Sequence, residues 1–554
     1  MRKEKTMKKV VSLLLALMMA FTMVACGNNT ADNGGAGNSG SQDQTSQPSE
    51  NDSQQTDDQT SAEPQMVEGG TFVMAIEEPI NSLAWYNNYS TDQGGQVFQS
   101  LYDPLWKMNK DGTKKFYIAE SCDVSEDGTV YTVKLREDVY WHDGEQFTAD
   151  DVIYTLDWMA DPECGALQAA AAYKVDGEFC SYEKIDEFTV QVSIVRASNM
   201  FGERLGNLHA MPEHIFKDVP VAEVLTCDEN NLGVGTGAFV KDDFVVGEKL
   251  VLKRNENYYL DKAHIDTLEI RCIANTGTQE VAFRNGELSV YTISNAETLS
   301  SFENEGVYDI NSYNDTRICY MEINPNAEAT STMEARQAII YALNLEEIVM
   351  GTYGSEKLCV VANSVQSHES MFYNPDTKNY EQDIDKAKEL IEATGLADKT
   401  IRIIYNSARV GQDSMAIMIQ SQLQAVGLTV EVEGMETSGY FTAFFRATDS
   451  FNISLMANGM GGDPGNYCGL FNNTRSGANM YTTEEVNNLW TEIDKEQDPA
   501  KRQELVDQVN AALKDCWSCV PFAETYCVFA SQTNIRGFED TDRMTDLTKL
   551  YFVA

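Results

Sequence analysis

Side chains that can do chemistry are present in this chain, but few of them have the spacing of a reactive site. The five histidines are His142, His209, His214, His264 and His368. They form no H-E-x-x-H motif, and no two of them have the spacing that places two metal ligands on one face of a helix. The sequence also contains no G-x-S-x-G elbow and no phosphate-binding loop. These patterns argue against metal, serine-hydrolase and nucleotide chemistry.

The cysteines also lack the arrangement of a metal centre. Cys516 and Cys519 are the only close pair among the 12 cysteines, and their C-x-x-C spacing fits a disulfide or half of a metal site. A zinc site with four such ligands needs a second close pair, which the sequence does not contain. We therefore predict partly buried free thiols, no metal and no cofactor.

Acidic side chains dominate the charge of the chain. Asp and Glu number 86 against 41 Lys and Arg, which gives a net charge of −45. A surface of this sign is repelled by nucleic acid and by anionic membranes, so neither is an expected partner, while a cationic or zwitterionic ligand is not excluded. So many acids leave a catalytic carboxylate pair open. Runs of acids are more commonly solvated faces, however, and we predict that the protein is not an enzyme.

The most promising binding chemistry lies in a glycine-rich loop at residues 458–467, directly after a predicted strand at 451–456. Ligands of open α/β sheets gather beyond the carboxyl ends of strands. The glycines allow a ligand to approach the backbone closely, and Asp463 offers a carboxylate near Asn458 and Met460. The alternative interpretation is a plain Asp-Pro turn.

The elements that would position this loop mix strands and helices without strict alternation. Residues 71–75 have the composition of an opening strand, and Tyr131, Val133 and Leu135 alternate with polar residues as in a half-buried strand. Thr148 and Asp151 form a capping-box pattern at the start of a helix. Other predicted helices end at Gly395 and Gly427 or begin at Asp498. These patterns indicate a mixed α/β fold.

The first 26 residues have the layout of an export signal. Five basic residues precede residues 10–24, which carry no charge, and a small residue stands before Cys26. The apolar run is short for a bilayer span, which needs roughly 20 residues. Position 26 resembles a bacterial lipobox, in which the cysteine is lipidated and becomes the mature N-terminus. We predict a signal peptide at residues 1–25, with an uncleaved membrane anchor as the alternative.

The next stretch lacks the side chains needed to build a core. Residues 27–65 are mostly Gly, Asn, Ser, Gln, Thr and Asp, with seven acids and no base. Such a segment stays disordered, so we predict a lipid-anchored tether at residues 26–66. The tether would reach roughly 35 Å on random-coil scaling. The rest of the chain is too long for one core, and its length suggests two or three domains.

Ten short stretches beyond the tether resemble the family 5 extracellular solute-binding proteins, which serve ABC importers of peptides, nickel and other solutes. The most recognisable is residues 141–152, with the sequence W-H-D-G-E-Q-F-T-A-D-D-V. The others are residues 101–105, 119–121, 125–128, 135–139, 211–215, 235–239, 257–259, 284–288 and 334–339. Each stretch is weak alone, but together they follow the order expected for the family.

The resemblance implies a periplasmic-binding-protein-like α/β fold of type II (cluster C), with two lobes, a hinge and an extra subdomain in the first lobe. By analogy, lobe I would comprise residues 67–306 plus 521–554, and lobe II residues 307–520. Most residues of these stretches, including His142 and His214, would then be structural. Ligands would bind between the lobes.

The resemblance also suggests which residues contact the ligand. Asp463 matches the end of the peptide-binding pattern, but the acid that receives the peptide ammonium would fall on Met460. Arg409 resembles the arginine of dipeptide binders that meets the peptide carboxylate, a task that suits a guanidinium; the alternative is a surface arginine. Asn88 and Tyr89 occupy the first-lobe stretch that faces the ligand. Gly465 stands where nickel-binding members carry a histidine, which argues against nickel.

We predict a monomeric, lipid-anchored receptor that captures oligopeptides or dipeptides and delivers them to ABC permease subunits. It would lie on the extracellular face of the cell membrane, or on the periplasmic side in a Gram-negative cell. The alternatives are a receptor for a sugar or a cationic small molecule, a surface sensor without transport, and a secreted hydrolase.

Overall fold

The computed structural model describes residues 65–554 except 88–91, 110–111, 447–449, 472–482, 542–543 and 545. The predicted signal peptide, Cys26 and almost all of the predicted tether lie outside the described residues. Pro64–Ala554 forms one compact unit. Within the described residues, no helix has the length and apolar character needed to cross a membrane. The mixed α/β fold predicted from the sequence is confirmed.

Two four-stranded sheets build the first part of this unit. One sheet has the order β11 (Phe239–Val245), β12 (Lys249–Arg254), β13 (Thr267–Cys272), β2 (Thr71–Ile76), and only β13 and β2 are parallel. The other sheet is antiparallel, with the order β5 (Ala119–Val124), β6 (Val130–Leu135), β10 (Thr189–Ser193), β9 (Ser181–Asp186). The predicted alternation in β6 is confirmed, because Tyr131, Val133 and Leu135 are buried.

Helices and small hairpins complete this part of the chain. The helices are α2 (Asp92–Leu101), α3 (Ala149–Ala160), α4 (Leu167–Ala171), α5 (Asn199–Gly206) and α6 (Glu213–Phe216). The hairpins are β3 (Trp106–Met108) with β4 (Lys114–Phe116), and β7 (Lys174–Val175) with β8 (Glu178–Phe179). The capping box predicted at the start of α3 is present, since Thr148 and Asp151 satisfy each other's backbone amides.

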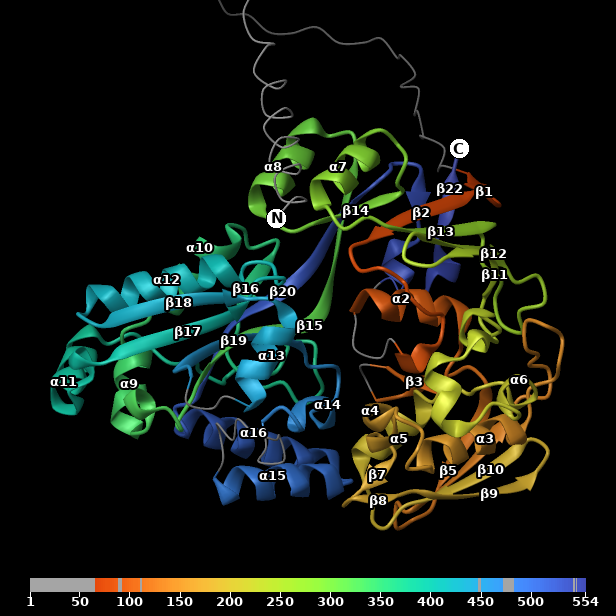
Figure 1. Cartoon of the computed structure of the whole chain (residues 1–554), viewed down its shortest axis with the longest axis horizontal. Helices are drawn as coiled ribbons and strands as arrows, with labels where there is room; N and C mark the ends of the chain where they lie inside the picture. The colour runs from red at the N-terminus through yellow and green to blue at the C-terminus, as the bar shows by residue number, and fades with distance from the viewer. Residues whose placement is uncertain are drawn as a thin grey trace, which may run out of the picture. The chain divides into compact units, whose positions relative to one another are not determined.

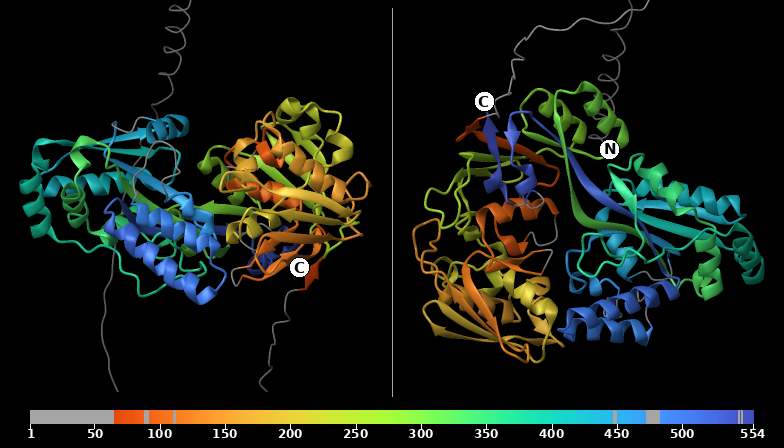
Figure 2. Two further views of the ribbon diagram at one scale, coloured as in Figure 1. Left: turned by 90° about the horizontal axis from the view of Figure 1, so that it is seen from below. Right: turned by 180° about the vertical axis from the view of Figure 1, so that it is seen from behind.

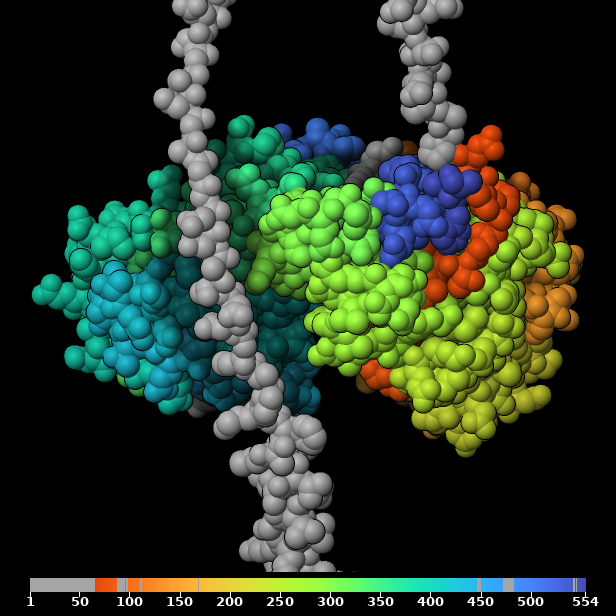
Figure 3. Space-filling model, turned by 90° about the horizontal axis from the view of Figure 1, so that it is seen from above, coloured from red at the N-terminus to blue at the C-terminus, as the bar shows by residue number. Residues whose placement is uncertain are grey.

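The two ends of the described chain meet in a small sheet. It has the order β1 (Met66–Val67), β22 (Tyr551–Val553), β21 (Ile535–Arg536). In Figure 3 the blue C-terminal residues lie against the red opening strands. The last residues of the chain therefore pack with its first strands.

The largest sheet has seven strands and includes the two longest strands of the described chain. Its order is β14 (Val290–Ile293), β20 (Cys519–Ser531), β15 (Asp309–Ile323), β19 (Ile453–Gly459), β17 (Thr400–Asn406), β18 (Thr429–Met435), and β16 (Cys359–Val361) also pairs with β20. The helices that follow or cover it are α7 (Thr276–Arg284), α8 (Ala296–Glu305), α9 (Met333–Tyr341), α10 (Leu345–Tyr353), α11 (Ile384–Thr394), α12 (Gln412–Ala425), α13 (Thr437–Arg446), α14 (Gly465–Cys468), α15 (Glu484–Lys495) and α16 (Pro499–Asp515). The predicted helix stop at Gly395 and N-cap at Asp498 are both confirmed.

Buried side chains gather in three clusters. The largest side chains of the first include Phe72, Trp106, Phe147, Phe201 and Phe239. The second includes Phe283, Phe302, Ile339, Ile348 and Phe522, and the third includes Tyr320, Tyr440, Phe451, Tyr467 and Trp490. We use "first lobe" for the elements around the first cluster and "second lobe" for α9 to α16 with β16 to β19. The predicted lobe boundaries at residues 306 and 520 stay a prediction.

The strands β15 and β20 run antiparallel beside each other along most of their length (Figures 1 and 2). Their register shifts between Asn314 and Arg317, where Thr316 has a φ of 58°. A positive φ at a β-branched residue is strained and persists only where the surroundings hold it. The bulge therefore marks a point at which the pairing of β15 with β20 is interrupted.

The cysteines of the described chain are all free. Cys516 and Cys519 are buried and form no disulfide, and no group of three or more potential metal ligands occurs within the described residues. The prediction of free, largely buried thiols is therefore confirmed for this part of the chain.

Candidate functional site

The loop after β19 lies where the sequence predicts it, but the strand is longer at this end than expected. β19 continues to Gly459, which pairs with Arg317 of β15, so Asn458 lies on the strand and not in the loop. The prediction of a strand end at residue 456 is wrong because pairing with a distant strand extends it. Asn458 is half-buried, and its Oδ1 accepts a hydrogen bond of 2.8 Å from the Tyr320 hydroxyl.

The β15 bulge holds the start of this loop. The amide of Met460 donates to the carbonyl of Thr316 at 3.0 Å, and the amide of Gly461 donates to its Oγ1 at 3.0 Å. Gly461 itself has a φ of 70°, which favours glycine. Met460 is fully buried in the third cluster. The strained residue in the ribbon and the glycine in the loop therefore fix each other.

A second segment holds the loop from the other side. The amide of Met371 donates to the carbonyl of Gly462 at 2.7 Å, and the Ser370 hydroxyl donates to the carbonyl of Gly461 at 2.8 Å. The loop is thus bonded to segments that lie about 90 and about 145 residues earlier in the chain. Its backbone is preorganised and not simply a flexible turn.

Asp463 faces the inside of the second lobe. Its two carboxylate oxygens each accept a hydrogen bond of 2.6 Å from the Arg502 guanidinium, and Oδ1 also accepts from the amide of Gly465 at 2.7 Å. Both side chains are buried, with Asp463 11% and Arg502 7% exposed. This bidentate pair gives Asp463 a partner within the protein, and it leaves little free capacity for a ligand ammonium group. The assignment of Asp463 to ligand binding stays a prediction.

Arg409 is the other predicted site residue that the structure describes in this lobe. Arg409 is exposed just beyond β17, and its amide donates to the carbonyl of Asn406 at 3.0 Å. Since β17 and β19 are parallel neighbours, the ends of both strands meet at one edge of the sheet. Arg409 and the loop after β19 are therefore both attached to that edge. Asn88 and Tyr89 lie outside the described residues.

Sequence reasoning did not find Glu524, a buried acid in the long strand β20. Its carboxylate accepts hydrogen bonds from Asn314 Nδ2 at 2.5 Å, from the Ser367 hydroxyl, and from the amide of His368 at 3.2 Å. His368 Nδ1 lies 2.8 Å from Glu524 Oε2. The group joins the β15–β20 ribbon to the segment that holds the loop. The only signal in the sequence was a lone acid in an otherwise apolar run.

The signature histidines have structural roles, as predicted. His142 Nδ1 accepts from the amide of Gly235 at 3.1 Å, and its Nε2 therefore donates to the carbonyl of Gly237 at 3.0 Å. Burial lowers the pKa of His142, so the ring is held neutral. His214 lies 2.8 Å from Asp143. Neither histidine is directed at the loop described above.

A small aromatic hollow lies in the first lobe, next in sequence to the predicted ligand-facing stretch. Its lining includes Trp85, Tyr86, Tyr102, Met211 and Phe216. The rings of Trp85 and Tyr86 meet edge to face at 5.4 Å. Trp85 and Tyr86, which shortly precede Asn88 in the sequence, are thus packed into the first lobe.

Comparison with known proteins places the chain among binding proteins. Residues 116–482 match the family described as bacterial extracellular solute-binding proteins, family 5 (middle). The oligopeptide-binding protein AppA of Bacillus subtilis is 24% identical over 474 residues, which are 79% of this chain and 78% of that protein. The dipeptide-binding protein of Escherichia coli is 24% identical over 372 residues, or 63% of this chain and 68% of that protein.

Solved structures agree with this fold. The ABC transporter substrate-binding protein CtaP of Listeria monocytogenes superposes with a TM-score of 0.80 at 26% identity, covering 88% of this chain and all of that one. AppA of Bacillus subtilis in complex with a nonapeptide gives a TM-score of 0.74 at 21% identity, covering 89% of this chain and all of that one. The predicted binding-protein fold with two lobes is confirmed.

Proposed function

Because the chain belongs to the bacterial extracellular solute-binding proteins of family 5, we propose that it is the receptor of an ABC importer and that its ligands are peptides. The observation that supports the peptide choice is its likeness, over most of the chain, to proteins named oligopeptide-binding and dipeptide-binding. The receptor binds its ligand and passes it to the permease without changing it.

The geometry of the second lobe supports recognition of a peptide backbone. The loop at residues 460–465 follows a strand end and is fixed by Thr316 and Ser370, so its polar groups are held in place before a ligand arrives. Arg409, on the neighbouring strand end, would bind the peptide carboxylate with its planar guanidinium. Asn458 and, from the first lobe, Asn88 and Tyr89 would contribute further polar contacts.

We assign a different task to the most buried residues of the loop. Met460 would act through packing in the third cluster, and Asp463 through its pair with Arg502, which anchors the loop to α16. Asp463 remains the candidate for an ammonium contact only if a ligand displaces part of that pair. A variant at this position distinguishes the two roles, as described in the Discussion.

Capture would proceed by closure of the two lobes. A ligand that contacts both lobes stabilises the closed arrangement by its differential affinity for that state. The ribbon of β15 and β20, which carries the bulge at Thr316, is the proposed hinge. Since the bulge also holds the ligand loop, movement of the ribbon and the position of the loop would be coupled.

The receptor would be a monomer held at the outer face of the membrane. Lipidation at Cys26 and the acidic stretch before residue 66 would keep the binding domain near its permease and raise its local concentration there. Because a single acyl chain anchors weakly, this arrangement requires the multiple chains of a lipoprotein. Labelling of cells with radioactive palmitate, compared with a Cys26→Ala variant, tests the anchor.

Native mass spectrometry of the purified protein tests the ligand class. We expect masses of retained peptides, which are released when the protein is unfolded and which bind again after refolding. Isothermal titration of an eluted peptide should then give a Kd, and Arg409→Ala should weaken the binding with no loss of stability. A retained sugar or metal ion in place of peptides, or cleavage of a supplied peptide, would overturn the proposal.

A further inference from the structure

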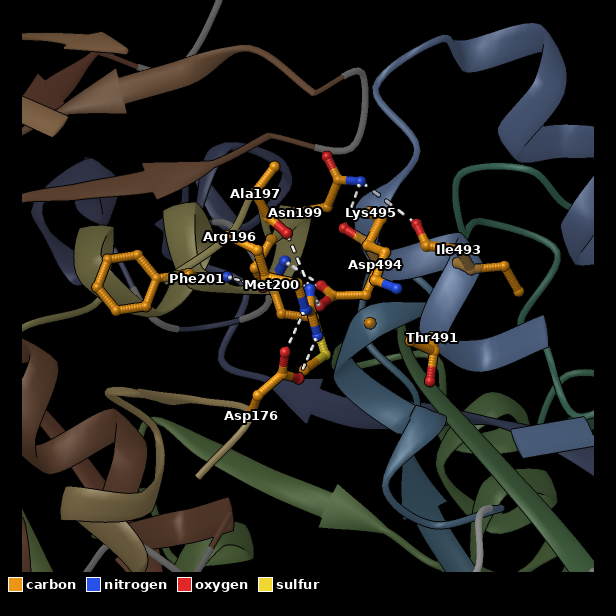
Figure 4. Close-up of polar contacts among 12 residues, drawn as sticks. Asp176, Arg196, Ala197, Asn199, Met200, Phe201, Thr491, Ile493, Asp494 and Lys495 are labelled. Atoms are coloured by element: carbon orange, nitrogen blue, oxygen red, sulfur yellow. Dashed lines mark hydrogen bonds and ion pairs between the residues drawn. The ribbon is translucent and has the colours of Figure 1, made fainter. Parts of the chain in front are cut away.

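An acidic residue of the second lobe caps a helix of the first lobe. Asp494, near the end of α15, accepts a hydrogen bond from the Ser198 hydroxyl at 2.8 Å and from the amide of Met200 at 3.2 Å, both at Oδ1. Its Oδ2 accepts from Arg196 Nη1 at 2.8 Å (Figure 4). Ser198 is the N-cap of α5. The first backbone amides of a helix have no partner within it and carry a positive partial charge, which favours a carboxylate at that end. The Asp494 carboxylate is therefore complementary to the N-terminus of α5.

A side chain of the first lobe also binds the carbonyls at the C-terminal end of α15. Asn199 Nδ2 lies within hydrogen-bond distance of three backbone carbonyls, those of Ile493 at 3.3 Å, Asp494 at 3.0 Å and Glu496 at 2.6 Å. The last carbonyls of a helix have no partner within the helix. Each lobe therefore satisfies the unpaired end of a helix in the other lobe, as Figure 4 shows.

The arginine in this contact is oriented by its own lobe. Asp176, in the turn between β7 and β8, accepts hydrogen bonds of 2.9 Å from both Nε and Nη2 of Arg196. This leaves Nη1 directed at Asp494, whose side chain is only 9% exposed. A guanidinium that is fixed in advance loses little conformational freedom when it pairs, so the contact forms at low entropic cost.

Close packing accompanies the polar contacts. Met200 of α5 packs against the third cluster, which belongs to the second lobe. A Cβ on Gly465 would fall 2.3 Å from Met200 Cγ, so any side chain there would displace Met200 where the lobes meet. Asn466 of α14 also donates to Glu203 of α5 at 3.0 Å. The contact therefore extends from α15 to α14, which directly follows the ligand loop.

One arginine connects this contact with the ligand loop. Arg502 donates through Nε to the carbonyl of Ile493 at 3.0 Å, while its Nη atoms bind Asp463. Ile493 is one of the carbonyls that Asn199 approaches. The end of α15 and the loop at residues 460–465 are thus held by the same guanidinium.

We propose that Arg196, Ser198 and Asn199 of the first lobe and Asp494 of the second form a clasp that holds the lobes together without a ligand. The closed arrangement would then be well populated in the free receptor, and a ligand would need less binding energy to complete closure. Arg196 follows strand β10 of the antiparallel β5–β6–β10–β9 sheet. The clasp would therefore give this subdomain of the first lobe a role in closure.

Hydrogen exchange on the full-length, ligand-free protein tests the clasp. The readout is the segment at residues 463–471, which contacts α5 through the hydrogen bond from Asn466 to Glu203. We expect this segment to be protected in the wild type, and its exchange to accelerate roughly tenfold or more in Asp494→Ala and in Asn199→Ala, because opening exposes it. Glu492→Gln removes an exposed acid from the same helix and should leave the exchange unchanged.

Exchange in β6 and β12 serves as the folding control, since both strands lie in the first cluster and should stay protected in every variant. If these strands also lose protection in Asp494→Ala, that variant is partly unfolded and its exchange does not report on the clasp. The test then depends on Asn199→Ala, which removes only an uncharged amide side chain. Unaltered exchange of residues 463–471 in Asn199→Ala with intact strands would overturn the clasp. Because no ligand is used, that result would leave the proposed peptide receptor untouched.

Discussion

Removal of the Asp463 carboxylate is expected to destabilise the second lobe, because it leaves the Arg502 guanidinium buried without its counter-ion. Both Nη atoms lie 2.6 Å from a carboxylate oxygen, and the two side chains are 7% and 11% exposed. Breaking a buried pair from one side costs roughly 3–5 kcal/mol. We therefore expect Asp463→Ala to lower the free energy of unfolding by about 3 kcal/mol or more.

Urea denaturation followed by tryptophan fluorescence measures this loss. Glu504→Ala, which removes an exposed acid from the same helix as Arg502, is the matched control and should change the free energy of unfolding by less than about 0.5 kcal/mol. The double variant Asp463→Leu, Arg502→Met removes both charges and should recover a large part of the loss, since apolar residues can replace a buried pair.

The same variants separate anchoring from ligand binding. If Asp463 acts only through Arg502, the double variant should bind an eluted peptide with nearly the wild-type Kd. If it also receives the ligand ammonium, the double variant should be folded but bind more weakly. A cost below about 1 kcal/mol for Asp463→Ala, as for an exposed ion pair, would refute the reasoning about this pair.

Three further predictions concern the loop, the pH dependence and the thiols. In Gly461→Ala the new Cβ would lie 2.6 Å from Asn466 Nδ2 at a φ of 70°, so we expect weaker peptide binding in titration calorimetry; an unchanged Kd would contradict the proposed loop. Burial raises the pKa of Asp103 to about 7, so the folded state keeps a proton that the unfolded chain releases near pH ~4. Stability should therefore fall as pH rises from about 4 to about 7, and urea titrations of Asp103→Asn should lack this component. Burial raises the pKa of the Cys180 and Cys359 thiols to about 12, so mass spectrometry should find them unlabelled by iodoacetamide at pH 8 until the protein unfolds.

Local signals predicted the elements whose ends depend on a few neighbouring residues. The start of α3 follows from Thr148 and Asp151, and the start of α16 from Asp498, because caps act within one turn. The alternation in β6 identified its buried face. These features are encoded over a few residues and need no knowledge of the rest of the chain.

Features that depend on distant partners could not be predicted in the same way. β19 extends to Gly459 because β15, about 140 residues earlier, pairs with it. The position of Asp463 in the loop predicts a carboxylate that is available to a ligand. In the structure this carboxylate is bound by the guanidinium of Arg502, which lies 39 residues later on α16. Strand order and glycine content predict where the loop lies, whereas the orientation of its carboxylate depends on tertiary packing.

The position of β20 in the chain has a consequence for biogenesis. This strand lies between β14 and β15 in the seven-stranded sheet and also pairs with β16, yet it begins at Cys519, about 200 residues after β15 ends. The sheet therefore cannot close until residues 519–531 have been synthesised, and pairings between such distant segments form slowly. For a member of an extracellular family, a sheet that stays open until then would help to keep the chain unfolded during export.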